Sequence, residues 1–499
     1  MNNESCRFEL VEPKVSALIE SLRAFGYELK TALADLIDNS ITAKAKNIWL
    51  FFNWTGKSSL IAVLDDGNGM NERELVEAMR AGSASPLEER DINDLGRFGL
   101  GLKTASFSQC RRLSVTSKKD GNLSAGCWDL DYVSAANQWR LLRECNNYTD
   151  GLQRLKKMEH GTVVLWEKMD RVVANTNEIS EIDHKHFLSK VADVRDHLQM
   201  VFHRYMETPY LLKIWINDRC LEPWDPFMKN HPTTQAKPVE KLNMDKVSCE
   251  VSGYILPHIS KLSPEDHQKG AGINGWNAHQ GFYVYRNRRM LVAGDWLGLG
   301  FQKEEHTKLA RIQLDITNSQ DDIWKIDVKK SKAQPPDCLR DDLRRIARLV
   351  RNDATKIYRH RGRVISRNAP GQNIFMWQEK VRHGKRFYLI NREHPLVKNI
   401  IKCSGSLKPK LDAFIKLAEE TFPAPLIIIS NSENPDSLGH PFEGIPSNEI
   451  KLVLAQVWEV MSASGLSDEQ IAARVLCMEP FDQFPEFVAG FVEGRKNAI

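Results

Sequence analysis

Asp35 and Asn39 are the first residues of the chain whose types and spacing could do chemistry. Apolar residues recur at helical spacing over residues 28–46, and side chains four positions apart lie on one face of a helix. A carboxylate can act as a base or orient a water molecule, and an amide oxygen is a ligand for Mg²⁺. We therefore expect Asp35 to handle an attacking water and Asn39 to bind the metal. Taken alone, such a pair is more typical of the polar face of a surface helix.

A second segment with candidate binding residues follows an apolar stretch at residues 60–64, which we predict to be a strand. Its sequence is AspAspGlyAsnGlyMet, from Asp65 to Met70, and both ends are candidate binding residues. The carboxylate of Asp65 can accept a hydrogen bond from an adenine amino group. The missing side chains of Gly67 and Gly69 allow a positive φ and close backbone approach to a flat ligand. An ordinary Asp-Gly turn between strands is the competing interpretation.

Residues 96–104 form a glycine-rich turn that enters a predicted helix. Backbone N–H groups in such a turn, together with the helix dipole, favour phosphate oxygens. The spacing excludes two common nucleotide sites. A P-loop needs lysine directly after its second glycine, where Leu102 stands here, and the dinucleotide fingerprint has its glycines in the reverse order. A purely structural glycine turn stays open. The candidate binding residues are Gly96, Phe98, Gly99, Leu100, Gly101, Lys103 and Thr104.

A fourth segment, HisGlyThr at residues 160–162, leads into a predicted strand, where Thr162 could place a hydroxyl beside Asp65. The four segments say more together than singly, because they occur in one order and at separations that accommodate the helices and strands between them. Together they predict a pocket for ATP and Mg²⁺ that is not a P-loop. The small, charged residues from 82 to 101, which lack periodicity, suit a mobile lid over this pocket.

The pattern of the whole chain is mixed α/β. Helical spacing predicts helices at 15–25, 28–46, 71–80, 340–363, 447–463 and 468–477, the last opened by a capping box of Ser467 and Gln470. Short apolar runs predict strands at 48–52, 60–64, 112–116, 162–166, 212–216, 282–289, 310–316, 387–390 and 426–429. The expected domains are 1–225, 246–336, a basic helical connector at 337–375 and an α/β region at 376–499, with a Pro-bearing linker at 225–239.

Composition restricts the class of protein. The 499 residues are 42% hydrophobic, and their net charge of +4 leaves any nucleic-acid contact to local basic clusters. Nine scattered cysteines without a CxxC pair argue against a disulfide framework and against a zinc site. The N-terminus has no secretory pattern, and no apolar run is long enough for a membrane span. We therefore expect a cytoplasmic protein that makes no membrane contact.

The four segments resemble the motifs of the GHKL superfamily, which comprises gyrase, heat-shock chaperone, histidine kinase and MutL ATPases. The resemblance covers about residues 10–215 and is strongest to the MORC and MutL branch, in particular to bacterial MORC-like proteins. It implies a layered α/β sandwich, the GHKL or Bergerat ATPase fold. It also implies a following transducer domain of S5-like fold, before the α/β C-terminal region.

In this branch the transducer domain sends a lysine to the γ-phosphate of ATP. Residues 284–290 resemble the transducer strand that bears an AsnGlyArg-like turn, and residues 324–332 resemble the lysine-bearing loop. Lys329, Lys330 and Lys332 are the candidates in that loop, and Lys330 is favoured. An exposed basic loop is the alternative.

Two positions depart from the family pattern. Asp35 stands where relatives usually carry a catalytic glutamate, and its side chain is one methylene shorter, which implies slow turnover. Thr42 stands where relatives commonly carry aspartate, which puts one supporting contact of this helix in doubt.

As the resemblance implies, ATP binding would close the lid and join two protomers into a homodimer, which hydrolysis would release. Such proteins act as DNA clamps in bacterial DNA repair, restriction or phage defence, often beside a nuclease or methylase partner. The alternative is a nucleotide-gated, chaperone-like or protein-binding switch with little turnover. A nuclease fits less well, because the C-terminal part offers no compact metal-ligand cluster. DNA contact is predicted at a basic helix, whose arginines could also form a solvated face: Arg340, Arg344, Arg345, Arg348 and Arg351.

Overall fold

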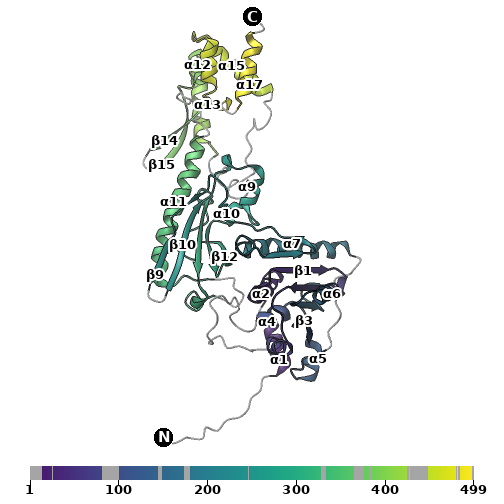
Figure 1. Cartoon of the computed structure of the whole chain (residues 1–499). Coiled ribbons are helices and arrows are strands. Elements are labelled where there is room, and N and C mark those ends of the chain that lie inside the picture. Colours follow the sequence, from purple (N-terminus) through teal and green to yellow (C-terminus); the bar gives the residue numbers. More distant parts are fainter. Residues whose placement is uncertain are drawn as a thin grey trace. The chain divides into compact units, whose positions relative to one another are not determined.

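The computed structural model of the chain is shown in Figure 1. It describes residues 14–24, 26–80, 101–143, 149–173, 180–244, 247–326, 333–364, 376–382, 385–423, 426, 448–478, 480–481 and 484–496. The chain divides into two compact units, 1–354 and 355–499. The first unit holds two separate sheets, and the second is mainly helical.

The first sheet contains seven strands in the order β4-β3-β5-β2-β1-β6-β7. Strand β6 pairs with β1 in parallel, and the other pairs are antiparallel. The strands predicted from the sequence in this part are confirmed to within a few residues. Their bounds are β1 Asn47–Asn53, β2 Leu60–Asp65, β3 Arg112–Lys119, β4 Asn122–Asp129, β5 Gly161–Glu167, β6 Lys213–Ile216 and β7 Arg219–Cys220.

The helices of this part begin and end close to the predicted positions, although those expected at 15–25, 28–46 and 71–80 are each shorter than predicted. Asn71 opens the third of them with a capping box, in which it accepts from the backbone of Glu74 while the Glu74 side chain accepts from Asn71. The helices are α1 Val15–Arg23, α2 Leu29–Thr42, α3 Glu72–Met79, α4 Gly101–Phe107, α5 Leu130–Ala136, α6 Thr149–Lys157, α7 Glu181–Val201 and α8 His203–Met206.

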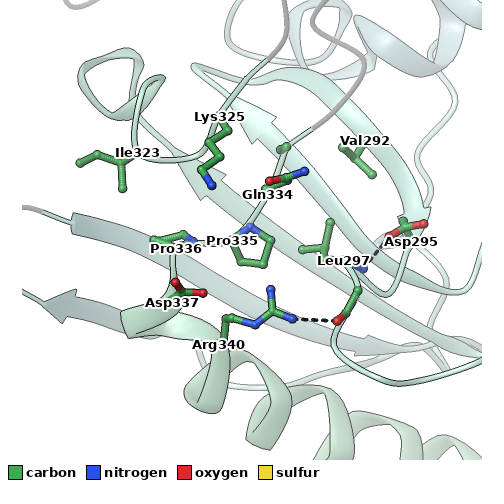
Figure 2. Close-up of a pocket in the computed structure, with 12 residues that line it drawn as sticks. Val292, Asp295, Leu297, Ile323, Lys325, Gln334, Pro335, Pro336, Asp337 and Arg340 are labelled. Carbon is green, nitrogen blue, oxygen red and sulfur yellow. Dashed lines mark hydrogen bonds between the residues drawn. The ribbon is translucent and has the colours of Figure 1, made fainter.

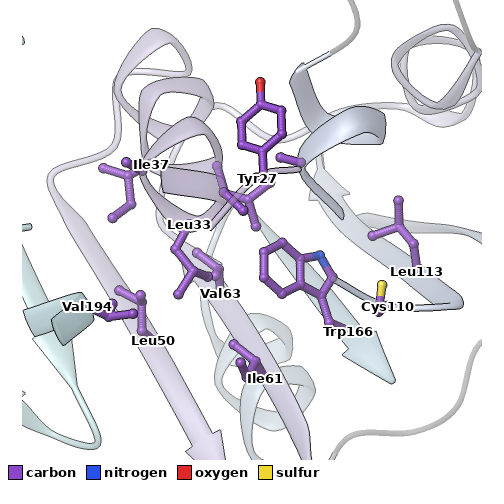
Figure 3. Packing of buried hydrophobic residues seen from close by; sticks show 14 of the residues in the cluster. Tyr27, Leu33, Ile37, Leu50, Ile61, Val63, Cys110, Leu113, Trp166 and Val194 are labelled. Carbon is purple, nitrogen blue, oxygen red and sulfur yellow. The ribbon is translucent and has the colours of Figure 1, made fainter. Parts of the chain in front are cut away.

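The core lies on both faces of the first sheet because the central strands are apolar on both sides. Figure 3 shows residues of the larger cluster. Side chains alternate along a strand, so Leu50 and Val63 face the cluster that includes Leu33 and Ile37 of α2. Phe51 points to the opposite face, where a smaller cluster contains residues of α6. Helix α2 is thus packed against the sheet and also contacts α4 and α7. It is buried even at three polar positions: Asp35, Asp38 and Ser40.

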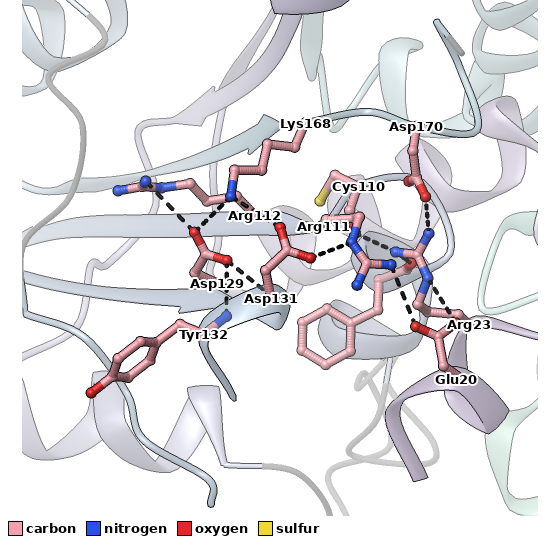
Figure 4. Close-up of polar contacts among 11 residues, drawn as sticks. Glu20, Arg23, Cys110, Arg111, Arg112, Asp129, Asp131, Tyr132, Lys168 and Asp170 are labelled. Atoms are coloured by element: carbon pink, nitrogen blue, oxygen red, sulfur yellow. Dashed lines mark hydrogen bonds and ion pairs between the residues drawn. The ribbon is translucent and has the colours of Figure 1, made fainter. Parts of the chain in front are cut away.

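A polar network fixes the helices at one end of the first sheet (Figure 4). The buried guanidinium of Arg23 donates to the carbonyl oxygens of Phe107 and Cys110, both at 2.9 Å, and forms an ion pair with Asp170 at 2.6 Å. These bonds satisfy carbonyls where α4 ends, which would otherwise be buried without a partner. Arg23 therefore ties α1 to the end of α4.

The second sheet contains six strands in the order β12-β11-β13-β10-β8, with β9 paired to β10. One prediction is wrong here: residues 282–289 are not one strand, because Asn287 and Arg288 both have positive φ and turn the chain into a hairpin. The linker predicted at 225–239 also contains a short strand. The strands are β8 Gln235–Ala236, β9 Glu240–Met244, β10 Val247–Ile255, β11 Gly281–Arg286, β12 Arg289–Asp295 and β13 Ala310–Ile316.

Short helices lie in the connections between the strands of this sheet and before α11 (Arg340–Val364). They are α9 Pro264–Ala271, α10 Gly275–Ala278 and the 3₁₀ helices η2 Ile259–Lys261, η3 Glu305–Thr307, η4 Asn318–Gln320 and η5 Asp337–Leu339; η1 Gly56–Ser58 belongs to the first sheet. The long basic helix predicted from arginine spacing is α11 Arg340–Val364. Its Leu343, Ile346, Ala347 and Val350 are buried, as the helical period requires.

The second unit contains a β-hairpin and several helices. Ser467 and Gln470 form the predicted capping box. The predicted strand at 387–390 is confirmed as part of a hairpin, whereas residues 427–429 of the strand predicted at 426–429 lie outside the described ranges. The elements are β14 Trp377–Arg382, β15 Lys385–Ile390, α12 Pro395–Cys403, η6 Gly405–Leu407, α13 Lys408–Glu420, α15 Asn448–Ser462, α16 Asp468–Val475 and α17 Pro485–Lys496.

Candidate active site

Asp65 is the buried last residue of β2, and its carboxylate faces α2. The Ser40 hydroxyl donates to Oδ2 at 2.8 Å, and the Gly67 backbone N–H donates to Oδ1 at 2.9 Å. Burial raises the pKa of Asp65 to about 6, although the Ser40 hydroxyl and the backbone N–H groups of Gly67 and Thr162 oppose the shift. Desolvation outweighs these three donors, so the carboxylate is ionised at neutral pH at a cost in free energy.

This arrangement fits an adenine base. An ionised carboxylate offers about four lone-pair positions, and the three donors that act on Asp65 leave acceptor capacity for an exocyclic amino group. A further donor would favour the charged form and lower the pKa of Asp65. The assignment of Asp65 to adenine remains a prediction that the local geometry supports.

The two glycines after Asp65 are required by packing within the protein. Gly69 has φ +66°, as predicted, and a Cβ there would lie 1.9 Å from the carbonyl oxygen of Lys118. Gly67 does not have a positive φ. A Cβ at Gly67 would lie 2.8 Å from the Cβ of Ala43 and 2.9 Å from Oδ1 of Asp65. The predicted close approach is therefore to the protein's own chain, and it holds the turn against α2 and β3.

Thr162 lies directly opposite Asp65 in the ladder between β2 and β5. Its hydroxyl is 2.8 Å from the hydroxyl of Ser117, which also accepts from the backbone N–H of Met70 at 2.8 Å. His160 Nδ1 lies 2.6 Å from the carbonyl oxygen of Gly67. The HisGlyThr segment thus secures the turn that follows Asp65. Ser117 was not predicted from the sequence, because no motif marks it.

Asp35 and Asn39 are one helical turn apart on α2, as predicted. Asp35 is buried and accepts a hydrogen bond from the Tyr27 hydroxyl at 3.0 Å, whereas Asn39 is exposed. The Asp35 carboxylate, which the Tyr27 phenol restrains, could act on one side of a phosphate group, and the exposed Asn39 amide could act on the other side. Tyr27 was not predicted, because it lies ahead of the helix and belongs to no recognisable motif. Thr42 is exposed, and its hydroxyl donates to the carbonyl oxygen of Asp38 at 3.0 Å.

Lys103 and Thr104 are buried in α4, which begins at Gly101. The Lys103 ammonium donates to the carbonyl oxygen of Ala78, at the end of α3, at 3.0 Å. Burial lowers the pKa of Lys103 to about 8. Its predicted contact with phosphate stays a prediction, as does that of Thr104. Other predicted residues lie outside the described ranges: Gly96, Phe98, Gly99, Leu100, Lys329, Lys330 and Lys332.

The site suits a magnesium ion that arrives with a nucleotide. Within the described ranges, no group of three or more His, Cys, Asp or Glu side chains could hold a metal ion by itself. Mg²⁺ commonly takes one or two protein oxygens and completes its shell with phosphates and water. The exposed amide of Asn39 is compatible with that role.

Most of the predicted DNA-contacting arginines on α11 also make contacts within the first unit. Arg340 and Arg344 donate to the carbonyl oxygens of Gly298 and Leu299, and Arg351 donates to that of Gln302. These bonds hold the helix against the second sheet. Two arginines are more exposed: Arg345, which pairs with Glu240 at 2.6 Å, and Arg348.

A cavity of about 690 Å³ lies beside the second sheet (Figure 2). Its lining includes Asp295 of β12, Lys325 at the beginning of the predicted lysine loop, Gln334 just after that loop, and Arg340 at the start of α11.

Part of the chain is similar to proteins of known families. Residues 27–162 match the model of the histidine kinase-, DNA gyrase B- and HSP90-like ATPases. The ATPase morc-1 of Caenorhabditis elegans is 32% identical over 95 residues, which are 19% of this chain and 11% of that protein. The DNA mismatch repair protein MutL of Rickettsia akari is 32% identical over 92 residues, 18% of this chain and 15% of that protein.

The match to the family model covers the part of the chain that contains Asp35, Asp65 and Thr162. The matches to the two relatives span less than a fifth of each relative's length. Every helix among the described residues is too short or too polar to traverse a lipid bilayer.

Proposed function

Because the chain contains a GHKL-type ATPase domain, distantly similar to the ATPase regions of MORC and MutL proteins, we propose that the whole protein is a slow ATP hydrolase. A domain of this type implies ATP hydrolysis. One observation supports the proposal most: α2 carries Asp35 and Asn39 and also Ser40, which donates to Asp65 at 2.8 Å. The adenine end and the hydrolytic end of the site are thus built on one helix.

In the proposed reaction, Asp65 binds the adenine amino group, and Asn39 would be the protein ligand for Mg²⁺. The metal supplies positive charge for the phosphate oxygens when it is bound. Asp35 orients the attacking water and accepts its proton. Tyr27 restrains the Asp35 carboxylate through their 3.0 Å hydrogen bond. The short aspartate side chain must hold the water closer to α2 than a glutamate would, which favours slow turnover.

The proposed conformational cycle couples ATP to dimerisation. ATP binding orders the lid at residues 82–101, and the favoured Lys330 of the second sheet's loop contacts the γ-phosphate. Two protomers then associate, and hydrolysis releases them. Such a cycle works only if ATP binds the closed state more tightly than the open state.

We further propose that the closed dimer is a DNA clamp that serves DNA repair, restriction or phage defence. The similarity to a DNA mismatch repair protein supports a DNA substrate, and the exposed Arg345 and Arg348 of α11 offer phosphate contacts. The alternative is a nucleotide-gated protein-binding switch with little turnover. It is favoured by the extensive intramolecular bonding of Arg340, Arg344 and Arg351.

Steady-state ATPase measurements with and without duplex DNA test the two functions. DNA stimulation that disappears as salt rises supports the clamp, since phosphate contacts weaken with ionic strength. ATP-dependent dimerisation without turnover supports the switch. Arg345→Gln with Arg348→Gln should remove the stimulation and leave basal turnover, with Lys241→Gln, on the neighbouring strand β9, as the matched control. Absence of both ATP binding and dimerisation would refute the proposal.

A further inference from the structure

We propose that Arg289, in the second sheet, is a positioning residue for the hydrolytic step, an inference that rests on the proposed function. Arg289 begins β12, and its Nε lies 3.4 Å from Oδ1 of Asp38. Asp38 is on α2, three residues after Asp35 and directly before Asn39. The two partners are 251 residues apart in sequence. The second sheet thus reaches the helix that carries the proposed catalytic groups.

The burial of this pair indicates a role in orientation. The side chain of Asp38 is 1% exposed and that of Arg289 is 4% exposed. Desolvating two charges costs about as much as their attraction returns, so a buried ion pair adds little stability over apolar side chains of similar volume. It does, however, tolerate few alternative geometries, because moving either partner leaves a buried charge without compensation. The pair therefore sets α2 in one position relative to β12.

Arg289 is itself held in place. Its Nη1 donates to the carbonyl oxygen of Met290 at 2.8 Å, and its guanidinium lies 5.7 Å from the ring centre of Phe202, where α7 ends. Two titratable neighbours are neutral near pH 7, since burial, aided by Arg289, lowers the pKa of His197 to about 3 and burial raises the pKa of Tyr205 above its usual range. Neither of these two side chains therefore compensates a charge of the ion pair.

Neighbouring contacts explain how movement of the second sheet would reach this pair. His203 Nε2 lies 2.8 Å from the Tyr285 hydroxyl, and the Tyr205 hydroxyl donates to the carbonyl oxygen of Asn287 at 2.5 Å. Both partners belong to the β11–β12 hairpin that carries Arg289. A shift of this hairpin would move α8 and, through Arg289, α2.

A cleft of about 560 Å³ adjoins the same contacts. Its lining includes Ile41 and Lys44 at the end of α2 and Asn287 and Arg288 in the hairpin turn. The space between the end of α2 and the hairpin is thus not fully packed, so a small displacement meets little steric resistance. We infer that the position of the second sheet determines whether α2 holds Asp35 and Asn39 in the hydrolytic geometry.

This role predicts a separation between binding and turnover. Asp65 belongs to β2 and receives only the Ser40 hydrogen bond from α2, whereas Asp35 lies on α2 itself. A displacement of α2 should therefore affect turnover more than adenine binding. Misplacement of a catalytic group by about 1 Å can cost on the order of 10²-fold in rate. We expect Arg289→Met to lower kcat about 10- to 100-fold and to change KM less than about 3-fold.

The test uses Arg289→Met, Asp38→Asn and the double variant in the full-length chain. If the two residues act as a unit, the double variant is no slower than the slower single variant, because each single change already breaks the pair. The double variant also removes both charges together, which safeguards folding. Arg289→Lys should retain more turnover than Arg289→Met. Wild-type kcat in Arg289→Met, or single effects that multiply in the double variant, would overturn the proposal.

Arg288→Met is the matched control. Arg288 is the exposed neighbour in the same turn, and its guanidinium lies over the ring of Tyr210 at 4.4 Å. Its replacement should leave kcat unchanged. Hydrogen exchange gives a second readout that does not depend on turnover. Arg289→Met should accelerate exchange in α2 relative to β2, and unchanged exchange in α2 would also count against the inference. A wild-type chain without ATPase activity would instead refute the proposed function.

Discussion

Replacing Asp65 by asparagine should abolish nucleotide binding and, at neutral pH, relieve a cost to folding. Burial raises the pKa of this carboxyl from 3.8 to about 6. A shift of about two units, at about 1.4 kcal/mol per unit, corresponds to about 3 kcal/mol. This is the free energy needed to keep the buried carboxylate ionised above pH 6 in the nucleotide-free protein.

The sign of the pH dependence follows from the raised pKa. Because the folded state binds the proton more tightly, the stabilising contribution of Asp65 is fully present below about pH 4 and is lost as pH rises through about 6. Asparagine has no charge to desolvate, and its amide oxygen can still accept from Gly67. The free energy of unfolding of Asp65→Asn, minus that of the parent, should therefore increase by about 2 kcal/mol between pH 4.5 and 7.

The assay combines urea denaturation of the first unit across this pH range with calorimetric titration of ATP and Mg²⁺. ATP should stabilise the parent by mass action and leave the variant unaffected. Asp66→Asn is the matched control: Asp66 accepts from the backbone N–H groups of Lys46 and Asn47 at 2.7 and 2.8 Å. This change should reduce stability and retain ATP binding. A stability difference that is independent of pH, or equal ATP affinity in Asp65→Asn and the parent, would refute the reasoning.

The remaining predictions concern turnover and folding. Asp35→Asn should keep ATP affinity and eliminate hydrolysis; measurable turnover in a radiolabelled phosphate-release assay would contradict its role. Tyr27→Phe should lower kcat about 5-fold by removing a hydrogen bond worth about 1 kcal/mol, and identical rates would exclude the restraint. Lys330→Ala should reduce kcat about 10²-fold with little loss of ATP affinity. If only Lys332→Ala has this effect, the γ-phosphate contact belongs to Lys332 instead. Gly69→Ala should destabilise the fold by at least about 2 kcal/mol, since its Cβ would lie 1.9 Å from a carbonyl oxygen; an unchanged melting temperature would oppose this.

Much of the first sheet and its helices could be predicted because the signals are local. Continuous apolar runs mark β1 and β2, and helical spacing marks α2. The strand predicted at 282–289 ran through the hairpin at Asn287 and Arg288 because an Asn-Arg turn lacks the glycine that usually marks such a turn, and only the family resemblance implied a turn within residues 284–290.

The candidate site was only partly predictable. Asp35, Asn39, Asp65 and Thr162 belong to motifs with a recognisable order, and the structure places Thr162 opposite Asp65. Their supporting groups carry no such signal. A serine or tyrosine hydroxyl becomes informative only when the fold brings it to a carboxylate, as happens for Ser40 and Asp65.

The sequence alone determined the residue types that can bind a nucleotide, their order and the elements that carry them, because hydrogen bonding and periodicity act over a few residues. Only the tertiary structure decided which side chains support them. Lys103 turns toward the end of α3, and Arg289 reaches Asp38 across 251 residues. Such contacts depend on how the sheets and helices pack, and no short stretch of sequence encodes that packing.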